Sequence, residues 1–321
     1  MKHISRREFL KKGIAIGAAA GGALLVGNSL FGKERSPALG YGTGKIGGMA
    51  QNIPDLVAVK NGEPDVMFDK AIEALGGMPS FVKKGQTVLV KPNIGWNCPP
   101  EAAATTNPKL VKRIIEHCFN AGAKKVYVFD HSCDSWELCY ETSTLEKTAK
   151  DAGAIVAPAH MESYYQKIDL KGASKLTSVM VHELYLQADV IINVPILKHH
   201  SSSSITCAMK NLMGVVWDRG AYHSIKGLDT CIADFCVGRR PDLNVVDAYN
   251  VMTKNGPRGY SRQGLSLKKT LLLSRDILAS DTAAVKVFGA EPNSISYLLK
   301  GKALGIGTMD LDSLSIKRIA L

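Results

Sequence analysis

The chain has 321 residues, of which 45% are hydrophobic and 21% are charged, an ordinary balance for a globular protein with one large domain or two small ones. The net charge of +11 falls to +6 once residues 1–37 are set aside, because that segment holds seven Lys/Arg and two Asp/Glu. No basic stripe with interleaved aromatic residues appears in the sequence. This excludes a typical nucleic-acid-binding protein and leaves a mild preference for small anions.

The amino-terminal segment combines paired arginines with a weakly apolar, Gly/Ala-rich run. It resembles a twin-arginine export signal, a match carried by Ser5, Arg6, Arg7, Phe9, Leu10 and Lys11. Residues 13–31 could also just span a bilayer, so a membrane anchor is the alternative. The resemblance implies transport by the twin-arginine (Tat) machinery and a periplasmic or other extracytoplasmic location, with membrane tethering if the leader is not cleaved.

The sequence divides into three parts. Residues 1–37 form the twin-arginine signal and the start of a linker. Residues 38–54 are expected to be a linker or irregular arm, because the stretch 32–54 is rich in Gly, Ser and Pro. Residues 55–321 are expected to form a single α/β domain. A small second lobe around residues 215–270 is the alternative organisation.

Strand and helix patterns alternate from residue 55 to the end of the chain. We expect strands over residues 55–60, 86–93, 124–132, 154–160, 188–197, 243–251, 268–277 and 315–321. We expect helices over residues 63–77, 107–123, 142–153, 205–216 and 280–289, the last opened by Ser280 or Asp281. This alternation predicts an α/β fold with a mostly parallel sheet flanked by helices.

Reactive side chains follow four of the predicted strands. They are Lys91 and Asn93, Asp130 and His131, Lys198 and His200, and Asp247. Each could simply end a strand, stabilise a turn or cap a helix. In open α/β sheets, however, ligands bind beyond the carboxyl ends of the strands, so we expect these residues to share one pocket.

The stretch from Pro195 to Gly214 contains two histidines and four serines between a predicted strand and a predicted helix. If the serines, beginning at Ser201, lie at the helix N-terminus, the free N–H groups there favour an anion, to which Lys198, Lys210 and Asn211 could add contacts. A flexible loop is the alternative, and the sequence has no nucleotide P-loop pattern. Adjacent residues of a strand point to opposite sides, so His199 and His200 are not expected to act on the same ligand.

The histidines and carboxylates suggest two kinds of chemistry. His200, His131, Asp130 and Asp247 could form a site for zinc, iron, manganese or nickel. Alternatively, His200 or His131, with Asp130, could act as general acid and base. The seven cysteines lack the spacing of an iron–sulfur cluster, although an oxidising compartment would permit a Cys133–Cys139 disulfide.

Four blocks resemble, in order, the signature blocks of the family known as domain of unknown function 362. The blocks begin at Val88, Ala188, Leu243 and Arg275, and the resemblance covers roughly residues 55–320. The positions that match the family motifs are Lys91, Pro92, Asn93, Asp130, Lys198, His200, Lys210, Asn211, Gly214, Asp247, Gly256, Pro257 and Asp281. Many family members carry twin-arginine leaders or ferredoxin-type cluster motifs, which implies redox or metal contexts, although this chain lacks the cluster motif. The strand ends also look distantly similar to the amino-terminal part of nickel-pincer lactate racemase, which hints at carboxylate ligands.

These observations favour an exported enzyme of redox or isomerase type that acts on a small anionic or carboxylate substrate. The sequence does not identify the cofactor, for which a transition metal is one candidate and an iron–sulfur cluster within this chain is not expected, and a redox protein is a possible partner. The alternatives are an exported protein that binds a metal or ligand, or assists a redox partner, without catalysis, and a structural adaptor.

Overall fold

The computed structural model describes residues 53–223 and 227–321, which form one compact unit. The leader and most of the linker predicted for residues 1–54 lie outside the described residues. The strands of the main sheet are β1 (Leu56–Lys60), β2 (Thr87–Pro92), β3 (Lys125–Val128), β4 (Ile155–Val156), β7 (Val190–Val194), β8 (Ile196–His200), β9 (Ser204–Thr206), β10 (Leu243–Met252), β11 (Leu265–Ser274) and β12 (Ile316–Ala320). A separate hairpin pairs β5 (Tyr165–Asp169) with β6 (Ser178–His182).

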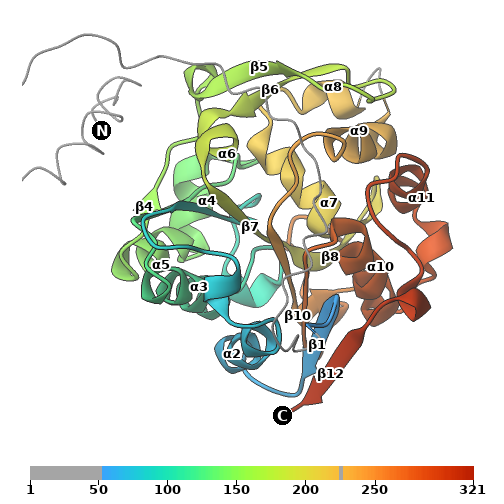
Figure 1. The fold of residues 1–321 in the computed structure, drawn as a ribbon. Coiled ribbons are helices and arrows are strands. Elements are labelled where there is room, and N and C mark those ends of the chain that lie inside the picture. The colour runs from blue at the N-terminus through green and yellow to red at the C-terminus, as the bar shows by residue number, and fades with distance from the viewer. Residues whose placement is uncertain (1–52, 224–226) are drawn as a thin grey trace, which may run out of the picture. The chain divides into compact units, whose positions relative to one another are not determined.

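Helices lie on both sides of the main sheet (Figure 1). They are α2 (Pro64–Ala74), α3 (Pro108–Asn120), α4 (Trp136–Thr142), α5 (Leu145–Asp151), α6 (Glu183–Gln187), α7 (Ala208–Asn211), α8 (Gly220–His223), α9 (Leu228–Phe235), α10 (Ile277–Phe288) and α11 (Ser296–Ala303). The predicted α/β class with a large, mostly parallel sheet flanked by helices is confirmed. Within the described residues, no helix has the length and apolar character needed to cross a bilayer.

The main sheet has the strand order β12-β1-β11-β10-β7-β2-β3-β4, with β8 and β9 branching from β10. The strands β10, β7, β2, β3 and β4 pair in parallel, and β8 also pairs with β10 in parallel. The strand β11 is antiparallel to both of its neighbours. The parallel strands therefore deliver their carboxyl ends to the same edge of the sheet, where α/β proteins bind ligands.

Alternating strand residues separate the two faces of the sheet. Val88 and Val90 join the apolar core beneath α2, α3, α4 and α5, whereas Lys91 belongs to the opposite face. The helix α3 shows why the core-facing helices form: the Asn107 side chain accepts from Lys109 N at 3.0 Å, and a stripe of five side chains is buried. Burying each large apolar side chain of that stripe contributes about 1.5–3 kcal/mol.

The structure divides two of the predicted elements. The expected strand over residues 188–197 becomes β7 and β8, which are separated by Pro195, a residue without an N–H for a ladder. The expected helix over 205–216 becomes β9, the short helix α7 and a 3-10 turn over Leu212–Val215. Each division changes which neighbouring groups the polar residues of this region can reach.

The helix α10 begins earlier than predicted, at Ile277. Its cap is Asp276, whose side chain accepts from Leu278 N and Ala279 N, so the predicted caps Ser280 and Asp281 lie within the helix.

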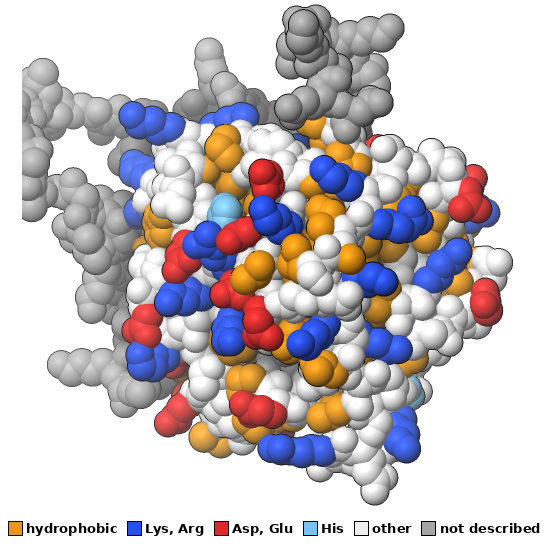
Figure 2. Space-filling view, turned by 90° about the horizontal axis from the view of Figure 1, so that it is seen from below, with side chains coloured by type: hydrophobic (Ala, Val, Ile, Leu, Met, Phe, Trp, Pro, Cys, Tyr) orange, Lys and Arg blue, Asp and Glu red, His pale blue; other side chains and the backbone are white. Residues whose placement is uncertain are grey.

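Residues 215–270 do not make a separate lobe. They supply β10 and the first part of β11, both internal strands of the main sheet. On the face of the molecule shown in Figure 2, basic and acidic side chains are interspersed.

Candidate functional site

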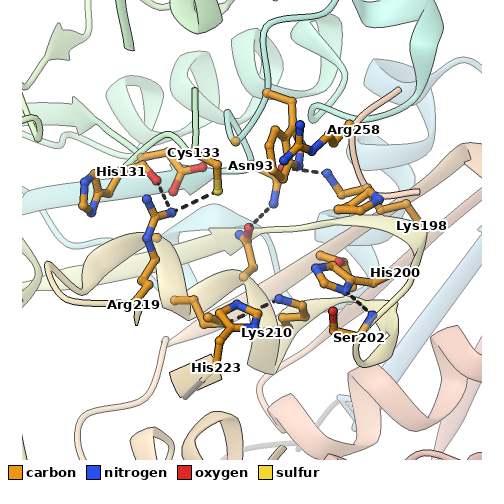
Figure 3. A pocket seen from close by; sticks show the side chains of 18 of the residues that line it. Asn93, His131, Cys133, Lys198, His200, Ser202, Lys210, Arg219, His223 and Arg258 are labelled. Carbon is orange, nitrogen blue, oxygen red and sulfur yellow. Dashed lines mark hydrogen bonds between the residues drawn. The ribbon is translucent and has the colours of Figure 1, made fainter. Parts of the chain in front are cut away.

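A cavity of about 420 Å³ lies at the carboxyl ends of the parallel strands (Figure 3). Nine of the ten predicted site residues line it, and only Asp247 does not. The nine are Lys91, Asn93, Asp130, His131, Lys198, His200, Ser201, Lys210 and Asn211. The structure therefore brings together side chains from β2, β8, α7 and the segment after β3, as the strand-end pattern predicted.

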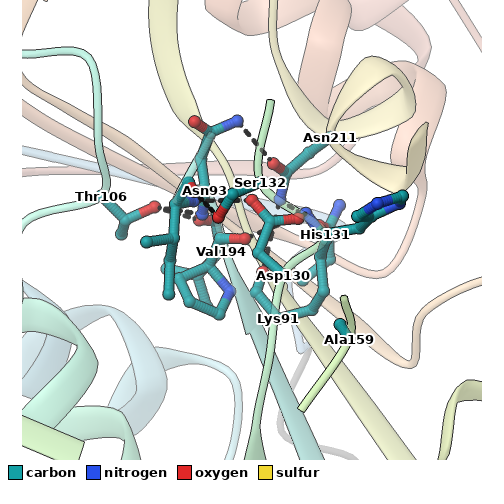
Figure 4. Close-up of polar contacts among 12 residues, drawn as sticks. Lys91, Asn93, Thr106, Asp130, His131, Ser132, Ala159, Val194 and Asn211 are labelled. Atoms are coloured by element: carbon teal, nitrogen blue, oxygen red, sulfur yellow. Dashed lines mark hydrogen bonds and ion pairs between the residues drawn. The ribbon is translucent and has the colours of Figure 1, made fainter. Parts of the chain in front are cut away.

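Lys91 and Asp130 form a buried ion pair on one wall of the cavity (Figure 4). Their Nζ and Oδ1 atoms are 2.8 Å apart, and the side chains are 0% and 3% exposed. Asp130 Oδ2 also accepts from Ile94 N at 2.6 Å, and Lys91 Nζ donates to Pro92 O at 2.9 Å. Burial lowers the pKa of Lys91, and the adjacent Asp130 opposes that shift. The two charges thus neutralise each other, so Lys91 is not the free anion clamp that the sequence suggested.

Gly214 packs directly against this ion pair. A Cβ atom at that position would lie 1.7 Å from Asp130 Oδ1 and 2.7 Å from Lys91 Nζ. Any side chain there would displace the pair. A glycine is therefore required because the backbone lies so close to the ion pair, and not because of its own backbone conformation.

A directed chain of asparagine amides crosses the sheet below the cavity. Its first link runs from Asn93 Nδ2 to Asn211 Oδ1, its second from Asn211 Nδ2 to Asn193 Oδ1, and its third from Asn193 Nδ2 to Asn244 Oδ1, at 2.8–3.0 Å. The chain ends where Asn244 Nδ2 donates to Ser274 O. Because each amide donates in the same direction, the hydrogen bonds polarise one another and fix Asn93 with its oxygen free to accept from Lys198.

Lys198 and Lys210 are buried cations that make no ion pair within the described residues. Lys198 is 1% exposed and donates to Asn93 Oδ1 at 3.2 Å and to Ala104 O. Lys210 is 8% exposed, and its Nζ donates to the thioether sulfur of Met213 at 3.4 Å. Burial lowers the pKa of each lysine to about 8. Both amines face the cavity, so a bound anion would supply the charge partner that the protein does not.

His200 lies on the same side of β8 as Lys198, two residues away, and His199 lies on the other side. His200 lines the cavity, whereas His199 Nδ1 accepts from Gly256 N at 3.1 Å. The expected separation of the two histidines is thus confirmed. Ser202 N donates to His200 Nδ1 at 3.1 Å, which places the proton of the neutral ring on Nε2. Burial, followed by the charges of Lys210 and Lys198, lowers the pKa of His200 to about 2, so the ring is a neutral donor.

Thr206 adds a hydroxyl to the cavity that sequence reasoning missed. It pairs with Lys198 across the β8–β9 ladder and is 3% exposed. Its Oγ1 atom has no hydrogen-bond partner in the described part of the chain, although it lines the cavity. Leaving a buried hydroxyl unsatisfied costs about 1–3 kcal/mol, a cost that a ligand oxygen would remove.

Two arginines complete the cationic lining, and neither was singled out from the sequence. Arg219 donates to the carbonyl oxygens of His131 and Ser132, both at 2.7 Å, and to Cys133 Sγ. Arg258 lies over the Trp96 ring, with Cζ 4.7 Å from the ring centroid. Arg258 directly follows the Gly256–Pro257 turn of the third motif block, so that block contained a signal for it. Arg219 lies outside any pattern that we recognised.

The four residues predicted as metal ligands do not form a metal centre. In Figure 3, His131 and His200 lie on opposite sides of the cavity. His131 Nδ1 donates to Val216 O at 2.9 Å, and its ring stacks on Trp217. Across residues 53–223 and 227–321, no three His, Cys, Asp or Glu side chains are close enough together to hold an ion. The donor set therefore does not fit the predicted metal. The pairing of Asp130 with Lys91 and the hydrogen bond from His131 to Val216 do not favour the general acid and base roles predicted for these two residues, whereas the role predicted for His200 stays a prediction.

Asp247 faces the opposite side of the sheet from the cavity. The predicted strand end at this residue is the middle of β10, which continues to Met252. Asn244, Asn193 and Lys91 lie opposite one another in paired strands and therefore share one face of the sheet. Side chains along a strand alternate between the two faces, so Asp247, three residues after Asn244, lies on the other face and points toward α3. There its carboxylate accepts from Asn107 N at 2.8 Å and from Tyr249 N at 3.1 Å. Burial raises the pKa of Asp247 to about 6, and its role is structural.

The serine run does not cradle an anion at a helix N-terminus. The strand β9 separates the serines from α7, and the first N–H groups of α7, from Ala208 and Met209, are taken by the buried Asp281 carboxylate at 2.6 and 3.1 Å. Ser201 and Ser202 still line the cavity, but from the hairpin turn between β8 and β9.

The Cys133–Cys139 disulfide that an oxidising compartment would permit is also absent from the described structure, where both thiols are free.

One relative and two of the solved structures that resemble this chain match it over part of its length. The chain is 25% identical over 242 residues to a thylakoid-associated protein from Synechocystis sp., with 73% of each chain covered. The lactate racemase apoprotein from Thermoanaerobacterium thermosaccharolyticum matches with 11% identity and a TM-score of 0.38, over 67% of this chain and 53% of that one. A structural-genomics target from Thermotoga maritima matches with 10% identity and a TM-score of 0.42, over 75% and 60%. The chain thus spans about half of the racemase and 60% of the Thermotoga protein.

A family model described as "Domain of unknown function (DUF362)" matches residues 88–286. That segment is more than half of the chain and contains every residue that lines the cavity. The chain belongs to the DUF362 family.

Proposed function

We propose that the cavity binds a small organic anion that carries a carboxylate and is the active site of an enzyme acting on it. The observation that carries the proposal is the pair of buried lysines, Lys198 and Lys210, that face the cavity and make no ion pair in the described structure. Burying an unpaired ammonium is costly, so a fold keeps two of them together only where something else offsets the cost.

The remaining lining residues agree with an anionic ligand. Arg219 and Arg258 add two guanidinium groups, His200 offers Nε2–H, and Thr206 offers a hydroxyl. Asp130 is the single carboxylate among the lining residues, and Lys91 already neutralises it. The volume suits a small molecule and not a polymer. Amines with a pKa of about 8 beside a neutral imidazole are groups that catalysis uses, which favours an enzyme over a passive carrier.

Calorimetric titration of the full-length chain with oxalate, malonate and inorganic phosphate tests the binding part of this proposal. We expect oxalate or malonate to bind with a dissociation constant below about 1 mM, and Lys198→Met and Lys210→Met each to weaken binding about tenfold or more, equal to 1.4 kcal/mol. The exposed Lys300, which does not line the cavity, supplies the matched control Lys300→Met. Absence of binding, or an equal loss with Lys300→Met, would contradict the assignment. Tighter binding of phosphate than of either dicarboxylate would overturn the carboxylate preference.

We further propose export by the twin-arginine route, supported by the pattern from Ser5 to Lys11. Replacing both Arg6 and Arg7 with lysine keeps the charge and removes the arginine pair. Cell fractionation is expected to find the unmodified protein outside the cytoplasm and the double variant inside it. An unchanged distribution would count against this route.

A further inference from the structure

The two unpaired lysines of the cavity differ in what their amines touch. Lys198 Nζ donates to two oxygen atoms, Asn93 Oδ1 and Ala104 O. In the described structure, the hydrogen-bond contact of Lys210 Nζ is to the sulfur of Met213 at 3.4 Å. Oxygen atoms are good acceptors for an ammonium group, whereas a thioether is a weak one. The protein therefore offers the ammonium group of Lys198 better hydrogen-bond acceptors than it offers that of Lys210.

A buried amine without oxygen acceptors is suited to lose its proton and expose its lone pair. Neutral lysine in an apolar or cationic pocket is a nucleophile toward carbonyl carbon. Burial of Lys210 favours its neutral form, as does the guanidinium of Arg219, whereas Cys133 and the Asp229 carboxylate raise the pKa of Lys210 and only partly offset the burial. His200, whose pKa is lowered by burial and then by the charges of Lys210 and Lys198, offers a neutral Nε2–H in the same cavity (Figure 3).

We infer that Lys210 is a nucleophilic amine that forms an imine with the carbonyl group of a small oxo acid. This inference rests on the proposed anion site, because Lys198 and the two arginines are needed to hold the carboxylate of the oxo acid. It adds a reaction class, since an anion site alone requires no covalent step. An oxo acid carries both of the required groups: a carboxylate that Lys198 can bind and an electrophilic carbonyl carbon that Lys210 can attack.

The step balances without an oxidant or reductant. The Nζ lone pair of neutral Lys210 attacks the carbonyl carbon, a C–N bond forms, and the π pair of the C=O bond moves onto oxygen. A hydrogen bond from His200 Nε2–H suits the oxygen as its charge develops. A proton passes from nitrogen to that oxygen to give the carbinolamine. The hydroxyl group then leaves with the second nitrogen proton as water, and a C=N bond remains.

Trapping with sodium borohydride tests the inference on the unmodified full-length chain. Glyoxylate is the probe, because it is the smallest molecule with both an aldehyde and a carboxylate. Hydride addition to the C=N carbon would leave a carboxymethyl group on the lysine nitrogen, which peptide mass spectrometry locates. We expect Lys210 to be the principal modified residue, oxalate to protect it, and the initial rate to rise about 25-fold between pH 6.5 and pH 8.5 as the amine loses its proton.

Two variants test the assignment. Lys210→Arg is expected to abolish the site-specific adduct. The control Lys300→Met, which lies outside the cavity, is expected to keep the adduct on Lys210 and the oxalate affinity of the unmodified protein. If oxalate binds but glyoxylate and borohydride leave Lys210 unmodified, or modify surface lysines equally, the imine is wrong and the anion site stands. If oxalate does not bind and Lys210 is not modified, both proposals fail.

Discussion

The buried lysines of the cavity fall into two groups, which differ in whether the protein supplies a counter-charge. Lys91 lies 2.8 Å from Asp130 and also donates to a backbone carbonyl, so its charge is neutralised within the fold. Lys198 and Lys210 are almost as deeply buried, yet neither has a carboxylate partner in the described structure. All three line the same cavity. The comparison shows that burial alone does not identify a functional lysine, because what matters is whether the fold already supplies the counter-charge.

The same substitution should therefore have opposite effects in the two groups. Replacing Lys91 with methionine keeps most of the volume but leaves Asp130 buried without its cation. We expect Lys91→Met to lower the free energy of unfolding by about 3–5 kcal/mol, as measured by urea denaturation at pH 7. The double variant Lys91→Met/Asp130→Asn should recover part of the loss because it removes the stranded charge. A loss below about 1 kcal/mol for the single variant would show that the pair is not structural.

Replacing Lys210 with methionine removes an unpaired buried charge and leaves no partner stranded. We expect Lys210→Met to raise the free energy of unfolding by about 1–2 kcal/mol at pH 7 without ligand. The gain should shrink above pH 8. There Lys210 is neutral in the native protein, whereas in the unfolded chain it keeps its proton up to the usual lysine pKa. The free energy of unfolding of the unmodified protein therefore rises with pH over this range, and the advantage of the variant falls. Destabilisation by this variant in ligand-free protein would mean that Lys210 has a counter-charge after all.

The pH dependence of anion affinity is the prediction with the smallest expected effect. The pKa of each unpaired lysine is about 8, so both are mainly protonated at pH 7 and mainly neutral at pH 9.5. Oxalate affinity should fall about tenfold or more between these two pH values in the unmodified protein. Titration calorimetry at both pH values measures this, and Lys300→Met serves as the control that should show the same decline. An affinity independent of pH would exclude these lysines as the binding cations.

The sequence predicted where the site lies better than it predicted which of its residues contact one another. Strand ends can be recognised from apolar runs, and that was enough to bring Lys91, Asp130 and Lys198 to one cavity. Asp247 failed because β10 continues five residues beyond it, and the face of a strand residue depends on register that one sequence does not reveal. The serine run failed because β9 intervenes and Asp281, distant in sequence, occupies the N–H groups of α7.

Residue pairing was the least predictable feature. Nothing local distinguishes Lys91 from Lys198, since each directly follows an apolar run in the sequence. The difference arises from Asp130, which is 39 residues from Lys91 and reaches it only because β2 and β3 are neighbours in the sheet. Arg219 was missed for the same reason, because its position depends on long-range packing. Thr206 was missed because residues 205–216 were expected to form a helix, whereas Thr206 pairs with Lys198 in the β8–β9 hairpin.

Proton uptake on binding tests the central claim, that the unpaired lysines hold an anion, most directly. Titration of the unmodified protein with oxalate at pH 8, in buffers of different ionisation enthalpy, measures the protons gained when the complex forms. An anion stabilises the charged lysines and raises their pKa, so we predict uptake of about half a proton for each lysine at pH 8 and almost none at pH 6. Binding with no proton uptake at pH 8 would contradict the account.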